Sequence, residues 1–375
     1  MKILTGAEID CNALRANYKA IKNIIPPQTE VLGVVKADAY GHGAPEVAKI
    51  AVESGCTMLS VARISEAKQL RDSGILVPIL LFGYTDPSFV EYMIDNNIIA
   101  SVGSFISGHM LNETARLLGK KLKVHIKIDT GMGRIGVKTQ KNDIVDETLS
   151  ISSLKNLEIE GIYTHFANAD SLDKTHAYHQ FSIYTDVLNQ LKQSGFEVKY
   201  RHAANSAAIM EMPETHLDLV RPGIIQYGLY PSNEVDRSRL KLKPVLSLKS
   251  TIIQIKDAEA GFKVSYGSTY STTNKTKIAV IPVGYADGYN RLLSSKGHMI
   301  VNGQKVPIIG RVCMDLTMVD IGNISNVNEG DTVTLIGTDG NSSVTADDIA
   351  DLTGTINYEV TCALTTRVKR KYLNL

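Results

Sequence analysis

Short apolar runs alternate with longer amphipathic segments from residue 10 to about residue 225. This alternation is typical of parallel strands joined by crossover helices. Three amphipathic segments, residues 45–55, 64–74 and 176–195, end on a glycine that can take the left-handed conformation found after helices. The predicted strands are VLGVVKA (31–37), TMLSVAR (57–63), PILLF (78–82), IIASV (98–102), VHIKID (124–129), EIEGIYTH (158–165), YRHAA (200–204) and LDLVR (217–221).

Eight strands separated by helices predict a TIM-type (β/α)8 barrel. After a polar link at 232–243 the rhythm changes to short strands with turn signals, such as Asn302-Gly303, which favours a hairpin. One short helix is expected near 345–354, where Thr345 and Asp348 resemble a capping box. The predicted fold class is therefore α/β, a TIM-type (β/α)8 barrel in residues 1–240 followed by a mostly β C-terminal domain in residues 241–375.

Lys36 lies at the predicted end of the first strand, in VVKADAYGHG (34–43), between an apolar run and a glycine-rich turn. Burial lowers the pKa of a lysine and frees its amine to attack carbonyl groups. The position therefore suits a lysine that forms a Schiff base. The alternative is a lysine that extends from the barrel mouth into solvent.

The segment KIDTGMGRIG (127–136) contains a literal G-x-G-x-x-G, at Gly131, Gly133 and Gly136, directly after a predicted strand. A dinucleotide fingerprint needs its third glycine inside a helix that packs on the strand. The residues that follow here are polar and have no apolar stripe. NAD binding is therefore only an alternative interpretation of this segment.

Alternation of apolar and polar residues in VHIKID (124–129) directs Lys127 into the barrel. A lysine in that position needs a partner or a modification. The plain alternative is a salt bridge with Asp129 or another acid.

Polar residues also fall at the ends of the last three predicted strands, namely His165, Asn205, Ser206 and Arg221, with Gly223 and Ile224 next. Barrels commonly bind phosphate through the loops after strands seven and eight, where backbone N–H groups and a hydroxyl surround the anion. Ser206, Gly223 and Ile224 suit that role. Taken singly, His165 is more often a core histidine and Arg221 more often a structural ion-pair residue, but their shared rim favours a site.

Composition and charge narrow the classes of function. The chain has 375 residues, of which 43% are hydrophobic and 21% charged, as in ordinary globular proteins. A net charge of +1 gives no overall field for nucleic acid or an anionic membrane, so we expect a small-molecule ligand. Apolar stretches are far shorter than the ~18 residues of a membrane span, and no signal peptide is expected at the N-terminus. Four scattered cysteines indicate free thiols, no zinc site and a cytoplasmic location.

In the second domain, tyrosines or polar residues stand beside glycines or turns in VSYGSTY (264–270), VGYADGY (283–289), GRVCMD (310–315) and INYEV (356–360). Tyrosines at domain edges commonly serve in packing. Spacing alone therefore does not make Tyr266 catalytic.

Together these segments resemble the pyridoxal-phosphate-dependent alanine racemases. The similarity runs from AEID and ALRANY (7–18) through the lysine motif at 34–43, the arginine motif at 127–136, HFANAD (165–170), ANSAA (204–208) and VRPGI (220–224) to the four segments of the second domain. The resemblance implies the cofactor pyridoxal 5′-phosphate and interconversion of L- and D-alanine, which supplies D-alanine for bacterial peptidoglycan. It also implies a homodimer with shared active sites.

The resemblance further implies roles for single residues. Lys36 holds the cofactor as an internal aldimine and is one catalytic base, and Tyr266 of the other subunit is the second. Arg221 faces the pyridine nitrogen and is supported by His165. The positions that match phosphate contacts are Tyr40, Ser206, Gly223, Ile224 and Tyr358.

Other matches concern the substrate. Arg134 lies near the ring oxygen and the substrate carboxylate, which Met314 contacts through its backbone. Lys127 matches a lysine that is carbamylated in some members, which pairs it with Arg134. The positions that line the entrance and the substrate pocket are Tyr285, Cys313 and Asp315.

Two rival functions share part of this chemistry. A decarboxylase of the same architecture also begins with a lysine-bound cofactor, but SYGSTY and GRVCMD argue against it. A non-catalytic pyridoxal-phosphate carrier needs only the barrel, which leaves the second domain unexplained. The choice between alanine and serine stays open, because an apolar pocket rejects an added hydroxyl only weakly.

Overall fold

The computed structural model describes residues 4–138 and 143–375. Contacts divide this part of the chain into two compact units. The barrel unit comprises residues 14–39 and 44–243, and the β unit comprises residues 4–13, 40–43 and 244–375.

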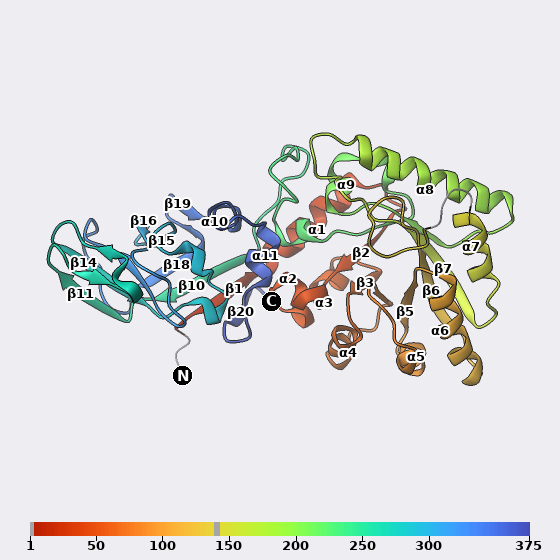
Figure 1. Ribbon diagram of the computed structural model, residues 1–375, viewed down its shortest axis with the longest axis horizontal. Coiled ribbons are helices and arrows are strands. Elements are labelled where there is room, and N and C mark those ends of the chain that lie inside the picture. The colour runs from red at the N-terminus through yellow and green to blue at the C-terminus, as the bar shows by residue number, and fades with distance from the viewer. Residues whose placement is uncertain (1–3, 139–142) are drawn as a thin grey trace. The chain divides into compact units, whose positions relative to one another are not determined.

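The barrel unit is built on a single sheet of eight parallel strands (Figure 1). Their bounds are β2 (Glu30–Val34), β3 (Met58–Val61), β4 (Ile79–Leu81), β5 (Ile98–Val102), β6 (Leu122–Lys127), β7 (Leu157–Tyr163), β8 (Tyr200–His202) and β9 (Leu219–Val220). The strand order is β8-β7-β6-β5-β4-β3-β2-β9. Arg221 N donates to Ala204 O at 3.0 Å, which joins the chain beyond β9 to the chain beyond β8 and closes the barrel.

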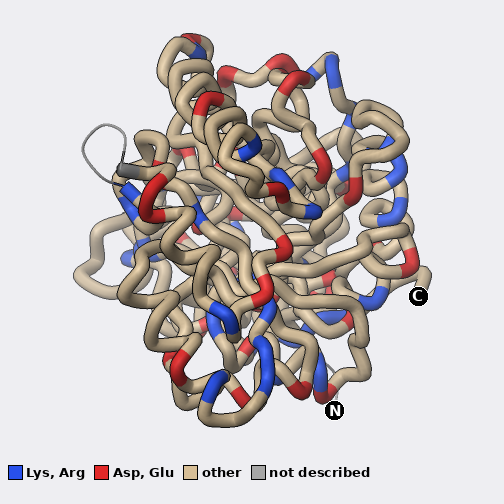
Figure 2. The backbone as a smooth tube through the Cα atoms, turned by 90° about the vertical axis from the view of Figure 1, so that its right-hand side faces the viewer, with Lys and Arg blue, Asp and Glu red and all other residues tan. Residues whose placement is uncertain are grey.

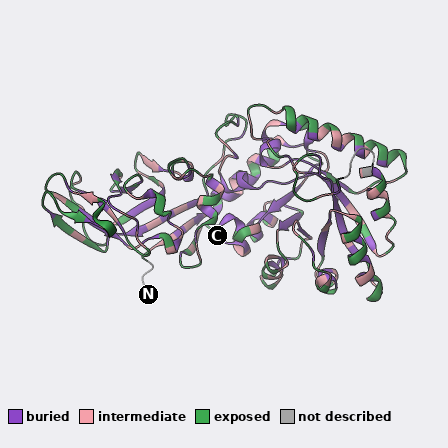
Figure 3. Ribbon diagram, in the orientation of Figure 1, coloured by how far each residue is buried: buried purple, intermediate pink, exposed green. Residues whose placement is uncertain are grey.

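Each predicted barrel strand is confirmed, although some are shorter than predicted. The strand predicted at 31–37 ends at Val34, because a turn of unusual handedness starts after Lys36. The strand predicted at 217–221 shrinks to Leu219–Val220, since Leu217 has a φ of 42° and cannot join a ladder. The barrel strands are buried almost throughout, as expected where helices cover a parallel sheet (Figure 3).

Helices separate the strands and show their exposed positions on the outside (Figure 3). The three predicted helices are confirmed, and the glycines that follow them, Gly55, Gly74 and Gly195, have φ values of 93°, 85° and 77°. The helices of this part of the chain are α1 (Cys11–Ile24), α3 (Ala44–Glu53), α4 (Ile64–Asp72), α5 (Val90–Asp95), α6 (Phe105–Leu117), α7 (Asp143–Ser152), α8 (Thr175–Gln193) and α9 (Ser206–Glu211).

The β unit contains a seven-stranded sheet, a three-stranded sheet and a two-stranded ribbon. The large sheet comprises β1 (Gly6–Asp10), β10 (Leu246–Thr251), β15 (His298–Val301), β16 (Gln304–Pro307), β18 (Thr332–Asp339), β19 (Ser342–Val344) and β20 (Lys369–Leu373). The others comprise β11 (Gln254–Ala258), β14 (Thr276–Ile281) and β17 (Thr317–Asp320), and β12 (Lys263–Val264) with β13 (Tyr270–Ser271).

The N-terminal strand β1 was not predicted, and it belongs to the β unit. It pairs antiparallel with β10, as Ala7 opposite Leu248, and parallel with β20, as Ala7 opposite Arg370. Ala7 and Ile9 are fully buried, so their alternation with Glu8 marks a one-sided strand. The barrel unit therefore starts at residue 14 rather than at residue 1.

Two local predictions in the β unit are confirmed. Asn302 and Gly303, with φ values of 46° and 74°, form the turn between β15 and β16. Thr345 and Asp348 form the capping box of α10 (Ala346–Thr353). A second helix, α11 (Asn357–Cys362), was not predicted.

Charged positions of both signs are mixed along the chain. Lys and Arg positions are interspersed with Asp and Glu positions in the view of Figure 2. Within the described residues, no helix combines the length and the apolar character needed to span a bilayer.

Candidate active site

Lys36 is the first residue of α2 (Lys36–Tyr40), which is a left-handed helical turn. Ala37, Asp38 and Ala39 have φ and ψ values between 45° and 53°, and Tyr40 has a φ of 54°. A left-handed conformation costs about 1–2 kcal/mol for each L-residue with a Cβ, so the turn holds on the order of 4–8 kcal/mol of strain. Strain of this kind persists at sites where the surroundings hold the backbone in place.

Local hydrogen bonds support the turn within the barrel unit. Ala39 N donates to Val35 O at 3.0 Å, and Asp38 Oδ1 accepts from Ala44 N at 2.8 Å. Ala39 is fully buried. The lysine backbone is therefore fixed on both sides, at the carboxyl end of β2, where barrel enzymes place their catalytic groups.

Lys127 ends β6 and is buried inside the barrel, with 5% of its surface exposed. Burial, together with the charges of Arg134 and Arg221, lowers the pKa of its ammonium group to about 8. Among the described ion pairs none involves Lys127, because Asp129 binds backbone N–H groups instead. The alternative of a salt bridge between Lys127 and Asp129 is therefore not found among the described contacts.

Asp129 organises the glycine-rich loop that follows β6. Its Oδ1 accepts from Gly131 N and Gly133 N, and its Oδ2 accepts from Arg134 N, all at 3.0 Å. The chain then returns to the barrel through a bridge between Ile128 and Val137. No helix starts at the third glycine, which rules out the arrangement of a dinucleotide fingerprint.

Arg221 directly follows β9 and is buried, with 3% exposed. Its Nη2 donates to Thr164 O and Ala203 O at 2.8 Å, and its Nη1 bonds His202 Nδ1 at 2.9 Å. Burial lowers the pKa of the guanidinium to about 10, so the group stays charged at neutral pH. Arg221 is therefore a fixed hydrogen-bond donor.

Two histidines accompany Arg221. His165, the predicted supporter, is 3.5 Å from Nη2, so His202 makes the shorter contact. Burial and the charge of Arg221 lower the pKa of both rings, which are neutral at neutral pH. A neutral His202 that accepts at Nδ1 carries its proton on Nε2, which bonds His125 Nδ1 at 2.9 Å.

Sequence reasoning missed His202 and Tyr163. The Tyr163 ring stacks on His202, with ring centroids 4.7 Å apart. The same ring faces Lys127 Nζ at 5.6 Å and the Arg221 guanidinium at 5.5 Å. The inward positions of β7 and β8 could have indicated both residues, since Tyr163 and His202 are paired in register.

Ser206 and Gly223 are close together, as predicted for a phosphate site. Gly223 N donates to Ser206 Oγ at 2.8 Å, and both residues are buried. Ser206 starts α9, and Ile224 starts the 3₁₀ helix η3 (Ile224–Tyr227). A hydroxyl beside the N–H groups that begin these helical turns is chemically suited to an anion.

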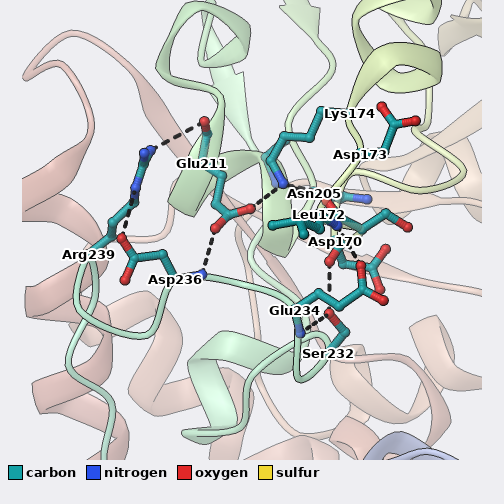
Figure 4. A network of polar contacts seen from close by, with 12 residues as sticks. Asp170, Leu172, Asp173, Lys174, Asn205, Glu211, Ser232, Glu234, Asp236 and Arg239 are labelled. Atoms are coloured by element: carbon teal, nitrogen blue, oxygen red, sulfur yellow. Dashed lines mark hydrogen bonds and ion pairs between the residues drawn. The ribbon is translucent and has the colours of Figure 1, made fainter.

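A network of polar contacts fixes the loop after β7 and the end of α9 to the link at 232–239 (Figure 4). Lys174 forms an ion pair with Glu211, and Glu211 Oε1 accepts from Asp236 N at 2.7 Å. Ser232 Oγ donates to Asp170 O at 2.8 Å. These contacts hold the loop that starts with His165 and the helix that starts with Ser206 in fixed positions relative to each other.

The barrel unit thus brings Lys36, Arg134 and Arg221 near Lys127 and His165, because their charges lower the pKa values of those two groups. Seven predicted residues belong to the β unit, namely Tyr40, Tyr266, Tyr285, Cys313, Met314, Asp315 and Tyr358. Tyr40 and Tyr358 lie side by side there, with ring centroids 6.0 Å apart. Burial raises the pKa of Tyr40, so its hydroxyl stays protonated and able to donate.

Tyr266 is 72% exposed in the β unit, on the turn η4 (Tyr266–Ser268). Ser265 and Gly267 on either side have φ values of 67° and 72°. Ser265 Oγ contacts Cys313 Sγ at 3.3 Å, which places Tyr266 near the GRVCMD segment.

Met314 and Tyr285 belong to the same part of the β unit. Met314 O accepts from Ala286 N, and Cys313 O accepts from Tyr285 N, each at 3.0 Å. A Cβ on Gly284 would lie 2.2 Å from Met314 O, so the approach of the two segments requires glycine there. Asp315 is paired with Arg367 at 2.7 Å.

A β/α barrel that carries a lysine on a strained turn, a buried arginine and a hydrogen-bonded Ser206–Gly223 pair at the carboxyl ends of its strands has the site placement typical of barrel enzymes. Two family models match the chain, "Alanine racemase, N-terminal domain" over residues 9–231 and "Alanine racemase, C-terminal domain" over residues 245–372. The chain therefore belongs to the alanine racemase family.

Individual relatives are similar to this chain over nearly its full length. An alanine racemase of Methanococcus maripaludis is 47% identical over 369 residues, which cover 98% of each chain. The structure of alanine racemase from Clostridium difficile 630 has a TM-score of 0.94 and 42% identity, covering 100% of this chain and 96% of that one. Alanine racemase from Bartonella henselae with covalently bound pyridoxal phosphate has a TM-score of 0.87 and 30% identity, covering 99% and 100%.

Proposed function

We propose that this protein interconverts L- and D-alanine with pyridoxal 5′-phosphate and supplies D-alanine for cell-wall peptidoglycan. The observation that carries the proposal is the combination, on one barrel rim, of the Lys36 amine, the charged Arg221 and the cradle of Ser206 and Gly223. The amine can react with an aldehyde, the guanidinium can donate a hydrogen bond to a pyridine nitrogen, and the cradle can bind a phosphate. A cytoplasmic location is proposed as well, because the described cysteines form no disulfide.

The residues of the barrel unit fit the cofactor. Lys36 would bind its aldehyde carbon, Ser206, Gly223 and Ile224 its phosphate, and Arg221 its ring nitrogen. Tyr40 and Tyr358 are proposed as further phosphate contacts. When bound, the cofactor draws electrons from the substrate's Cα and makes the α-proton removable.

Arg221 is proposed to control whether the pyridine nitrogen of the cofactor carries a proton. A guanidinium with a pKa of about 10 offers N–H groups and no acceptor. Its neighbours Thr164 O, Ala203 O and His202 hold it in one orientation. We propose that Arg221 leaves the ring nitrogen without a proton, which restrains side reactions at some cost in rate.

Two bases act on opposite faces of Cα in the proposed reaction. One removes the α-proton and the other returns a proton to the opposite face, which a single base cannot easily do. Lys36 Nζ serves one face. Tyr266 Oη is exposed in the single chain, which supports its use in the active site of the other subunit of a homodimer.

The substrate carboxylate is proposed to bind Arg134 and the backbone of Met314. The cationic surroundings of Lys36, Lys127, Arg134 and Arg221 favour an anionic substrate. They also favour conversion of Lys127 to a carbamate. In that reaction the ammonium group first loses one proton. The neutral Nζ then forms a bond to the carbon of CO₂ and releases a second proton, so a buried cation becomes an anion near Arg134.

Carbamylation of Lys127 is expected to depend on pH. Only the neutral amine attacks CO₂, and a pKa of about 8 makes much more of it neutral near pH 8 than for an ordinary lysine. In carbon-13 bicarbonate at pH 8, the protein should show a carbamate carbon resonance that Lys127→Gln lacks. Lys123→Gln, on the same strand but in a half-exposed ion pair, is the control and should keep it.

The unmodified lysine has its own signature in stability. Because the folded pKa of about 8 lies below the ordinary 10.5, the unfolded chain binds more protons between these values. Without CO₂ the free energy of unfolding should therefore rise with pH from about 8 to about 10.5, relative to Lys127→Gln. A spectrum without the carbamate resonance and a flat difference in stability would contradict the assignment.

The proposed function is tested by incubating purified protein and pyridoxal phosphate with one pure alanine enantiomer. Formation of the racemate supports it, with serine run alongside to set the substrate preference. Release of carbon dioxide from L-amino acids without racemisation would favour a decarboxylase instead.

A further inference from the structure

Glu66 bridges two neighbouring loops at the carboxyl ends of the barrel strands. It lies in the first turn of α4, and its Oε2 accepts from Ala62 N at 2.8 Å and Arg63 N at 2.9 Å. Its Oε1 accepts from Ala37 N at 2.6 Å. One carboxylate thus ties the loop between β3 and α4 to the turn that follows Lys36.

The chemistry of this contact requires a carboxylate. Both oxygens of an ionised carboxyl group accept hydrogen bonds, whereas an amide presents one oxygen and one NH₂ group. A glutamine at position 66 would therefore turn N–H donors against either Ala37 or the start of α4.

The bond to Ala37 is directed at the strained part of the chain. Ala37 follows Lys36 directly and is the first residue of the left-handed turn, with φ 52° and ψ 53°. Asp38 links the turn by a hydrogen bond to the start of α3, which follows it in the chain. Glu66 links the turn by a hydrogen bond to the neighbouring loop, between β3 and α4. Both hydrogen bonds therefore determine the backbone direction at Lys36, and with it the direction of the lysine side chain.

We infer that Glu66 is a positioning residue, which holds the left-handed turn and thereby aims the Lys36 amine at the cofactor and the α-carbon. This inference rests on the proposed function. Glu66 itself acts through Ala37 and moves no proton.

The test compares Glu66→Gln with the parent protein in two measurements. The first is the rate at which cofactor-free protein attaches pyridoxal phosphate to Lys36, followed by borohydride reduction and peptide mapping. The second is alanine racemisation. A hydrogen bond to a charged group is strong enough that kcat and the attachment rate should each fall about tenfold to a hundredfold, with little change in KM. Glu113→Gln, a partly exposed residue paired with Arg116 on α6, is the control and should match the parent.

A second substitution separates positioning from helix capping. Ala37→Gly lets residue 37 adopt a positive φ without strain, and Ala37 is exposed, so no cavity results. Ala37→Gly combined with Glu66→Gln should therefore recover a large part of the lost rate. If Glu66 only caps α4, the glycine will recover nothing.

The outcomes are distinguishable. A parent protein labelled at Lys36 and a Glu66→Gln variant with unchanged rates would overturn the inference alone. Loss of folding or rate in Glu66→Gln that Ala37→Gly does not repair would also overturn it. A parent protein that neither attaches the cofactor at Lys36 nor racemises alanine would overturn the proposed function, and the inference with it.

Discussion

Lys36→Ala is expected to leave a folded protein that no longer binds pyridoxal phosphate covalently and no longer racemises alanine. The substitution removes both the attachment point and one base. Since a positioned base alone contributes about 10²- to 10⁴-fold, racemisation should fall by at least about 10⁴-fold. The measurements are borohydride trapping with peptide mapping and the rate of D-alanine formation from L-alanine.

The matched control is Lys49→Ala, on the neighbouring helix α3, where the lysine pairs with Glu46 at the surface. It should keep the label and the rate of the parent. A label on a residue other than Lys36, or full turnover in Lys36→Ala, would remove the basis of the proposed function.

Tyr266→Phe is expected to separate proton removal from racemisation. Without the phenol hydroxyl one face of Cα loses its base, while Lys36 still exchanges the α-proton of one enantiomer with solvent. Interconversion should fall by about 10²- to 10⁴-fold, whereas deuterium uptake into that enantiomer continues. The measurement is the chirality and deuterium content of recovered alanine in heavy water.

Tyr84→Phe is a suitable control, because Tyr84 and Tyr266 are equally exposed at 72%. It should racemise alanine at the parent rate. Parent-rate racemisation in Tyr266→Phe would exclude Tyr266 from the reaction. Loss of exchange in both enantiomers would show that Lys36 and Tyr266 do not serve opposite faces.

The barrel could be predicted because its signals are local. Apolar runs and helix-ending glycines mark elements wherever they occur, and β2 and α3 were found in this way. β1 was missed, since five residues of alternating pattern become a strand only through pairing with β10 and β20. α11 was missed for a similar reason, because it is too short to show a periodic apolar face.

The candidate site was predictable in its residue types and less so in its geometry. Lys36, Ser206 and Arg221 stand at strand ends in the sequence, so their common rim follows from the barrel. The partners of Arg221 were harder to foresee, since His202 becomes one only when β8 and β9 meet. The handedness of the turn after Lys36 has no local signal, because alanine ordinarily avoids a positive φ.

The left-handed turn has a stereochemical consequence for the protein itself. For a D-amino acid the backbone region near φ 52° is the ordinary helical one, so mirror-image alanine would fit positions 37 and 39 without strain. In a chain made by chemical synthesis with D-alanine at these two positions, the methyl groups would point in mirror-related directions and the backbone strain would be relieved. In this enzyme the product of the proposed reaction is thus the residue that its own lysine-bearing turn would adopt most easily.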